Sequence, residues 1–529
     1  MGSSRQRPPT LELDTGRAES DAQPAPAHPP PSGPVRSGGG AWHPGPRLDS
    51  GTLQAILLAG LVATLYGNTL GNGFVWDDRL TAAASPGTLL RPSPGTYYRP
   101  VAMLTFATDR LLWGDNPAGF HLTNILCHGL TSWLLLGLCR SLGMSSGVAL
   151  AASLLFAAHP LQSEAVAYIS GRTDVLCALF VLLAVRVWRR ARHWLDARAA
   201  ASAGLLLIAL LCKETAVLIP VVLLLVHPHE RAPRPVLPLL AAAAWLLFFA
   251  GTGPGMRVAG VSERLGAVAA AALTYARLVV WPVDLHLERF TPVQGWTVAT
   301  TVMAWAALAL LGAAMVRIAR GVDGGMLWLA LAAATYAPVS GLVPIYPQIA
   351  NQALFTPEHA LYLPLLGLTP LVAGAAAGSR AARRRRTLPA LLLTVLAAWG
   401  AIVVRRNADW RDEETLFRHT LAYDPPVGRV WFNLGNLRLH AGDDPAAAAL
   451  YREALRRSPR DSAVHYNLAI ALQRQGELRD AEMEYARVIA LDPDFVAAYR
   501  AQAALLGARG EMEEARRLLL EAQRRERRD

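Results

Sequence analysis

The chain has 529 residues, of which 53% are hydrophobic and only 17% are charged. Such a length exceeds one compact soluble domain, and such a composition excludes an ordinary globular protein, so we predict a polytopic membrane protein. The basic residues behind the formal charge of +11 are scattered in short loops beside apolar segments. The positive-inside rule explains that arrangement, so nucleic-acid binding is not expected.

The first 50 residues and the first apolar segment set the predicted orientation. Residues 1–50 are rich in Pro, Gly, Ser, Ala and Arg and lack apolar periodicity, so we expect a disordered tail that its arginines keep in the cytoplasm. The segment from about Leu53 to Leu70 has no cleavage-site pattern and is predicted to be a retained span. The loop that follows, with Asp77 and Asp78, then lies on the outer face.

Hydropathy predicts about eleven spans, in a membrane domain that covers residues 51–404. An apolar run from Ala199 to Val226 is interrupted by Lys213 and Glu214. We interpret it as two short helices that meet at an outer turn, with a single kinked helix as the alternative.

The end of the membrane domain is marked by a cluster of arginines, Arg380 and Arg383 to Arg386, which should be cytoplasmic. The last span, about Leu388 to Val404, then crosses outward. It leaves residues 405–529 on the same side as Asp77 and Asp78. The polar loop before the preceding span contains Gln348, Asn351, Gln352 and Glu358.

Residues 405–529 contain an internal repeat. Three prolines and three glycines each recur at intervals of 34 residues: Pro425, Pro459 and Pro493, and Gly442, Gly476 and Gly510. This interval is the period of tetratricopeptide repeats. Two full repeats, a cap and a half repeat predict a stacked α-solenoid, although the pattern does not identify a ligand.

Asp77 and Asp78 are predicted to be the reaction centre, because adjacent carboxylates at the mouth of a span are costly unless they meet water, a metal or a substrate. One of them would take the proton of an attacking hydroxyl, or hold a divalent cation that activates it. Arg99 is available as a counter-charge. A solvated surface pair or a helix N-cap is the structural alternative.

Other polar residues of the predicted outer loops would line the same site. They are His159, Glu164, Arg172 and Asp174. A purely structural network of salt bridges is the alternative for them. Arg99, Arg172 and Lys213 are the cations that would hold a phosphate, unless Lys213 and Glu214 simply pair with each other. Glu358 and Tyr362, at the start of a later span, complete the predicted lining, with a simple cap as the alternative for Glu358.

The order of several motifs resembles the family of transmembrane and tetratricopeptide-repeat-containing O-mannosyltransferases, over nearly everything after residue 50. The motifs are Phe74-Val75-Trp76-Asp77-Asp78, Tyr98-Arg99-Pro100, His159-Pro160, Gly171-Arg172-Thr173-Asp174, Cys212-Lys213-Glu214, Leu361-Tyr362-Leu363-Pro364 and Arg406-Asn407-Ala408-Asp409-Trp410. The chain departs from the family at Glu358-His359, where Glu-Arg is usual.

The resemblance implies an all-α fold, with a polytopic membrane helix bundle of GT-C type followed by the repeat solenoid. It also implies a polyprenyl- or dolichyl-phosphate sugar as donor and an acidic catalyst at the position of Asp77 and Asp78. We therefore expect an inverting glycosyltransferase that moves a sugar, mannose by resemblance, to an acceptor hydroxyl. The acceptor would be a protein or peptide docked by the repeats.

The expected location is a bacterial inner membrane, with a cytoplasmic N-terminus and periplasmic repeats. A non-catalytic membrane scaffold that recruits envelope proteins through its repeats is the main alternative, and it predicts that Asp77 and Asp78 can be replaced freely. A transporter of lipid-linked sugars ranks last, because the ionisable clusters lie at span ends rather than at mid-membrane.

Overall fold

The computed structural model describes residues 50–83, 98–193, 195–225, 235–252, 261–342, 353–379 and 386–527. Several predictions fall outside these residues. They concern the disordered tail before residue 50, the polar residues Gln348, Asn351 and Gln352, and the arginines from 380 to 385.

Among the described residues, four helical segments are long and apolar enough to cross a membrane. They are α1 (Ser50–Tyr66) with the short η1 (Gly67–Gly71), α5 (Pro117–Ser141), α13 (Val298–Arg320) and α16 (Thr387–Asp409). Shorter apolar helices pack among them: α6 (Ser146–Ala158), α9 (Ala197–Cys212), α10 (Ile219–Leu223), α11 (Val236–Thr252), α14 (Gly325–Tyr336) and α15 (Leu365–Gly378). The chain is thus a multi-pass membrane protein, while the count of about eleven spans stays a prediction.

Five further α-helices belong to the described part of the bundle. They are α2 (Asp78–Ala82), α4 (Pro100–Trp113), α7 (Gln162–Ala167), α8 (Arg172–Trp188) and α12 (Val261–Val280). Of these, α8 contributes many side chains to the core of the bundle. The predicted break at Lys213 and Glu214 is confirmed, since α9 ends at Cys212 and a 3-10 turn over Glu214–Ala216 separates it from α10.

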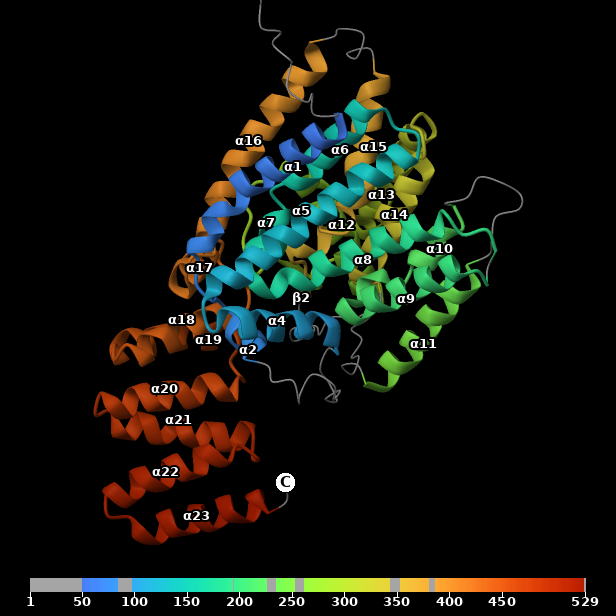
Figure 1. Cartoon of the computed structure of the whole chain (residues 1–529). Coiled ribbons are helices and arrows are strands. Elements are labelled where there is room, and N and C mark those ends of the chain that lie inside the picture. The colour runs from blue at the N-terminus through green and yellow to red at the C-terminus, as the bar shows by residue number, and fades with distance from the viewer. Residues whose placement is uncertain are drawn as a thin grey trace, which may run out of the picture. The chain divides into compact units, whose positions relative to one another are not determined.

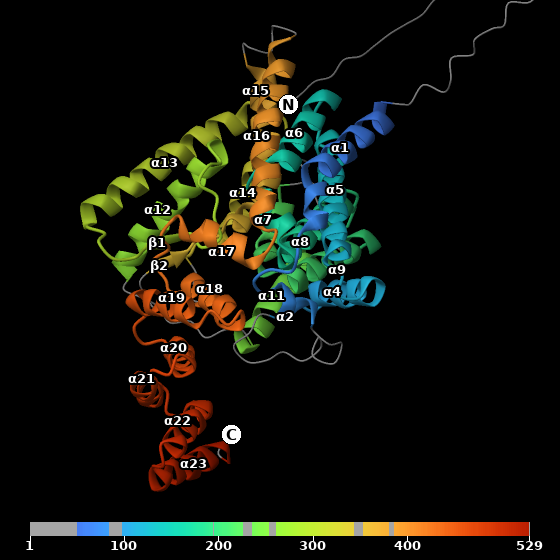
Figure 2. The ribbon, with the colours of Figure 1, turned by 90° about the vertical axis from the view of Figure 1, so that its left-hand side faces the viewer.

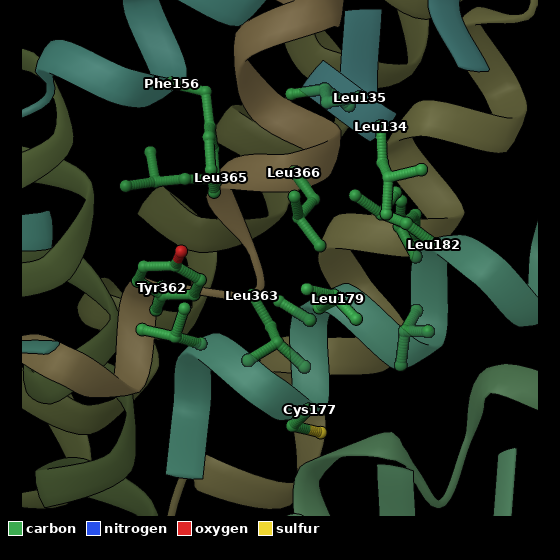
Figure 3. Close-up of a cluster of buried hydrophobic side chains, with 14 of the residues drawn as sticks. Leu134, Leu135, Phe156, Cys177, Leu179, Leu182, Tyr362, Leu363, Leu365 and Leu366 are labelled. Carbon is green, nitrogen blue, oxygen red and sulfur yellow. The ribbon is translucent and has the colours of Figure 1, made fainter. Parts of the chain in front are cut away.

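The core of the bundle is built by leucines and aromatic residues from helices far apart in the sequence. Figure 3 shows Leu134 and Leu135 of α5, Phe156 of α6 and Leu179 and Leu182 of α8 beside the segment from Tyr362 to Leu366. Three of the four cysteines are fully buried and all four are free thiols, as expected of small core residues.

Two strands of three residues each were not expected in an all-α chain. β1 (Phe290–Pro292) and β2 (Ala353–Phe355) pair in antiparallel register, with Phe290 opposite Phe355. The backbone N–H of Thr356 then donates to the carbonyl of Arg289. This small ladder brings the loop before β1 next to Glu358.

The repeats form a stack of antiparallel helix pairs (Figure 1). Their helices are α17 (Glu413–Leu421), α18 (Arg429–His440), α19 (Asp444–Arg457), α20 (Ser462–Arg474), α21 (Leu478–Leu491), α22 (Val496–Ala508) and α23 (Met512–Glu526). Gly442, Gly476 and Gly510 all have positive φ at the turn between the helices of a pair, a conformation that glycine adopts without steric cost. The period of 34 residues is therefore the period of the structure.

The end of α1 and η1 is joined to the end of α16, and both views show the two helices side by side (Figures 1 and 2). Asn72 donates to the carbonyl of Asn407, and Asn407 donates to the carbonyl of Leu65, both at 2.9 Å. Because α16 continues to Asp409, the predicted domain boundary after residue 404 falls inside this helix. We call this end of the bundle, where α16 leads into α17, the repeat-side end.

Candidate active site at the repeat-side end

The segment from Gly73 to Asp78, which we call the Asp loop, leaves η1 and crosses the repeat-side end. The backbone N–H of Gly73 donates to the carbonyl of Arg411 at 2.8 Å. Phe74 packs edge-to-face on Phe120, with 5.3 Å between ring centroids. The loop is therefore attached both to the membrane bundle and to the segment between α16 and α17.

Asp78 is fully buried and accepts three hydrogen bonds. Its Oδ1 accepts from the backbone N–H and the hydroxyl of Ser170, both at 2.8 Å, and its Oδ2 accepts from the backbone N–H of Val75 at 3.2 Å. Burial raises the pKa of Asp78 to about 7, against the lowering effect of these donors. The carboxyl of Asp78 thus holds two loops together and has little surface left for a substrate.

Asp77 is exposed to solvent, in contrast to Asp78. It stands at the N-cap position of α2, but its side chain makes no capping hydrogen bond, so the N-cap alternative is wrong. Partial desolvation raises the pKa of Asp77, while the guanidinium of Arg429 lowers it, as do hydrogen bonds from Tyr168 and Trp76. An accessible carboxyl with a raised pKa suits a general base.

The counter-charge of the Asp loop comes from the repeats. Arg429, at the start of α18, lies over the ring of Trp76 at 4.8 Å and pairs with the buried Glu288. Arg99, which the sequence offered for this role, forms a two-pronged ion pair with Glu214 instead, at 2.8 and 3.1 Å. The prediction that Lys213 pairs with Glu214 is also wrong.

Lys213 instead pairs with Asp174, at 2.7 Å, and both side chains are buried. At Lys213 the backbone is extended (φ −161°, ψ 141°) and the next residue starts a 3-10 turn. Successive side chains of extended backbone point to opposite sides, so Lys213 and Glu214 reach different partners. The two ion pairs hold α9 to α8 and to the start of α4.

Arg172 lies deeper than a ligand-binding cation should. Its side chain has no exposed surface, forms an ion pair with Asp109 at 2.5 Å and donates to Asn124 and to the carbonyl of Phe120. Its guanidinium also lies over the ring of Phe106 at 4.4 Å. Arg172 therefore stabilises the turn that carries Ser170 and is not available to a phosphate.

Glu358 and Glu164 form a second buried acidic group at the repeat-side end. Glu358 accepts from the backbone N–H of His286 at 2.5 Å and from Arg406 at 3.4 Å, and burial raises its pKa to about 7. Glu164 accepts from both the backbone N–H and Nδ1 of His359, at 3.0 and 2.9 Å. Although burial raises the pKa of Glu164, His359 and Arg406 lower it by more.

His159 and Tyr362 face the interior of the bundle. Tyr362 is fully buried, and its hydroxyl lies 2.8 Å from Nδ1 of His128. Nε2 of His159 lies 3.0 Å from the carbonyl of Val279, and its ring packs on Trp399 at 4.4 Å. Neither side chain reaches the Asp loop, so the structure does not group them with Asp77.

An apolar groove of about 640 Å³ lies between α6, α15 and α16. Its lining runs from Ser145, just before α6, to His159, just after it, and includes Leu392 and Trp399. The groove thus follows the whole length of α6, about 20 Å at 1.5 Å per residue. Its lining of leucine, valine and alanine side chains matches a hydrocarbon chain better than a polar ligand.

Metal ligands were one option for the paired aspartates. Within the described parts of the chain, no group of three or more His, Cys, Asp or Glu side chains is arranged to hold a metal ion. The partners of Asp77 and Asp78 from outside the Asp loop are Ser170, Tyr168 and Arg429. None of these three residues was predicted from the sequence to belong to the site.

Protein-family models agree with the repeat architecture. Tetratricopeptide-repeat models match residues 401–462 and 438–505. The crystal structure of MamA matches 29% of this chain and 88% of its own, at 18% identity and a TM-score of 0.22. The repeats predicted from the sequence are confirmed by the family models.

Longer matches come from membrane proteins. The human protein O-mannosyl-transferase TMTC3 is 26% identical over 521 residues, which cover 84% of this chain and 55% of TMTC3. Human TMTC1 is 28% identical over 544 residues, which cover 84% of this chain and 60% of TMTC1. The chain is thus similar to protein O-mannosyl-transferases over most of its length.

The resemblance drawn from the sequence motifs is thereby confirmed. A shorter match of higher identity is the Drosophila melanogaster protein O-mannosyl-transferase Tmtc1. It is 37% identical over 195 residues, which cover 32% of this chain and 22% of Tmtc1. The chain spans little more than half the length of the two human O-mannosyl-transferases. A bacterial origin stays a prediction.

Proposed function

We propose that the chain is an inverting glycosyltransferase that moves mannose from a polyprenyl-phosphate carrier to a hydroxyl of a protein acceptor. The reaction would take place on the side of the membrane that carries the repeats, predicted to be the periplasm of a bacterium. The observation that carries the proposal is the Asp loop, in which one carboxyl, Asp77, is exposed while its neighbour Asp78 is buried and hydrogen-bonded. The names of the homologous enzymes support the sugar and the class of acceptor.

In this reaction Asp77 is the general base. It takes the proton of the acceptor hydroxyl as that oxygen bonds to the anomeric carbon of the sugar. The bond from that carbon to the phosphate oxygen breaks, and its electron pair leaves with the polyprenyl phosphate. A base of this kind typically contributes about 10² to 10⁴ in rate.

The apolar groove supports a lipid-linked donor. Beside α6 and α16, this groove has the length and the lining for part of a polyprenyl chain.

The phosphate of the donor also needs a cation close to Asp77. Arg99 lies eleven residues before Arg110, which donates to the carbonyl of Ala82. Along α4 that separation is about 16 Å, so Arg99 lies far from Ala82, the residue that Arg110 contacts at the end of the helix following Asp77.

Arg289 is a better candidate than Arg99 for the donor phosphate. It follows Glu288, whose pKa the charge of Asp77 raises. Its ion pair with Glu358 is long, at 3.6 Å, whereas Arg99 holds Glu214 through contacts of 2.8 and 3.1 Å. Arg289→Gln should raise KM for the donor more than Arg99→Gln does.

The deciding experiment is transfer of labelled mannose from polyprenyl-phosphate mannose to peptide acceptors, in membranes with matched amounts of each variant. Asp77→Asn should reduce transfer at least about 100-fold. Asp115→Asn is the matched control, because Asp115 is an exposed carboxylate between α4 and α5. Equal transfer by the wild-type chain and Asp77→Asn would remove Asp77 from the mechanism, whereas no transfer by the wild-type chain from any donor tested would favour the scaffold.

The groove is tested by filling it. Leu392 lines the groove from α16, so Leu392→Trp should raise KM for a long-chain donor. The same variant should leave KM for a donor with a short, soluble chain unchanged. An equal effect on both donors would show that the groove does not hold the lipid.

A further inference from the structure

The backbone of the Asp loop is strained at one residue. Trp76 has φ +55°, in the left-handed region that a bulky side chain rarely adopts. Such a conformation persists only where the surrounding structure fixes it. The two residues that follow Trp76 are the paired aspartates, so whatever holds Trp76 also fixes the direction of Asp77.

The contacts that hold the Trp76 side chain come from the repeats. The ring of Phe417 in α17 packs edge-to-face against it, with centroids 5.5 Å apart. The guanidinium of Arg429 in α18 covers it at 4.8 Å. Arg429 is held in turn by Glu288, whose carboxylate accepts a hydrogen bond from its Nε at 2.6 Å.

We propose that Arg429 is a positioning residue of the active site: supplied by the first complete repeat, it holds Trp76 in its left-handed conformation and so fixes the carboxyl of Asp77. This inference rests on the proposed function for its catalytic meaning, but the geometry is independent of the reaction. It makes α18 part of the active site, as well as part of the repeat array.

The charge of Arg429 adds an electrostatic effect. The ionisable groups around Asp77 are Asp78 on its own loop, Tyr168 before α8, Glu288 before β1, and Arg429. Among these groups Arg429 carries the positive charge, and this charge favours the ionised carboxylate of Asp77. Its removal should therefore raise the pKa of Asp77 and move the acid limb of the rate profile to higher pH.

The test compares Arg429→Gln and Arg429→Lys with the wild-type chain by two measurements. The first is hydrogen–deuterium exchange of peptides that cover residues 72–83, which requires no activity. The second is the pH dependence of kcat and KM for mannose transfer. Arg438→Gln is the matched control, because Arg438 lies on the same helix and pairs with Glu414, away from the Asp loop.

We expect Arg429→Gln to exchange faster over residues 72–83 and to lower kcat by about tenfold to 100-fold, with its acid limb at higher pH. Arg429→Lys keeps the charge but loses the flat stacking group, so the limb should stay in place while exchange still rises. Arg438→Gln should behave as wild type. Unchanged exchange in Arg429→Gln would overturn the inference, whether or not the wild-type chain transfers mannose. Absence of mannose transfer by every variant, the wild type included, would refute the proposed function but not the positioning role of Arg429.

Discussion

Replacing Asp78 by asparagine should loosen the Asp loop. The carboxylate of Asp78 accepts from three donors, which are the N–H and O–H of Ser170 and the N–H of Val75. An asparagine side chain has one acceptor oxygen and one NH₂ group. If its oxygen keeps both bonds from Ser170, the NH₂ group must face the N–H of Val75, and that donor is left without a partner.

The cost follows from this count. A buried donor without an acceptor costs about 1 to 3 kcal/mol. A central value of about 2 kcal/mol corresponds to roughly 30-fold more frequent opening of the loop, at about 1.4 kcal/mol per factor of ten. In the reverse orientation the backbone N–H of Ser170 loses its acceptor, while the hydroxyl of Ser170 can donate to Thr81, so the cost is of the same order.

Hydrogen–deuterium exchange measures this opening directly in peptides that cover residues 72–83 and 165–172. Asp78→Asn should exchange faster in both, because Asp78 joins the two loops. Asp77→Asn is the comparison: its side chain is exposed, and the asparagine oxygen can still accept the hydrogen bond from Tyr168, so exchange should stay close to the wild type while transfer is lost. Faster exchange in Asp77→Asn than in Asp78→Asn would refute the assignment of base and anchor.

Three further predictions concern residues around the loops. Arg172→Gln leaves Asp109 buried without its cation and should cost about 3 to 5 kcal/mol in thermal unfolding; an unaltered melting temperature with a higher donor KM would restore the phosphate role. Gly171→Ala places a Cβ 2.7 Å from the carbonyl oxygen of Ala165, so the melting temperature and transfer should both fall, and wild-type values would show that the turn can adjust. Burial raises the pKa of Glu358 from 4.5 to about 7, so the folded state retains a proton that the unfolded state releases. Stability should therefore fall by about 1.4 kcal/mol per pH unit between these two values, and parallel pH profiles of the wild-type chain and Glu358→Gln would contradict this.

The repeats were predictable because their signal is local. The glycines at 442, 476 and 510 are 34 residues apart and all carry the positive φ that the turn requires. The small and aromatic positions Ala447, Tyr451 and Ala454 are buried, as the repeat pattern predicts. Each repeat contacts mainly its neighbours, so one period of sequence contains almost all the information for one period of structure.

The partners of the two aspartates were not predictable, because they come from distant loops. Ser170 lies 92 residues after Asp78, and Arg429 belongs to a different domain. Topology placed these loops on one side of the membrane but did not say which of them touch. The strands β1 and β2 were missed for a related reason: three residues are too few to show an alternating pattern, and one of them is Pro292.

The candidate cations show the same limit. Arg99, Arg172 and Lys213 are equally good phosphate ligands by sequence, because span ends on the same side all look accessible. In the fold each has an acidic partner, and two of the three are fully or nearly buried. Asp109, the partner of Arg172, lies within α4 next to Arg110, and nothing in the local sequence pairs it with an arginine on a distant loop.

The shared core at the repeat-side end decides which experiments can separate an enzyme from a scaffold. Trp410, Leu416 and Phe417 are almost completely buried and pack with Val75 and Tyr168 in one hydrophobic cluster. Removing residues 411–529 would expose this cluster and release the Asp loop, so an enzyme and a scaffold would both lose function. Deletion of the repeats therefore cannot discriminate between them, whereas single substitutions of Asp77 and Arg429, both with side chains at the surface, leave the cluster intact and can.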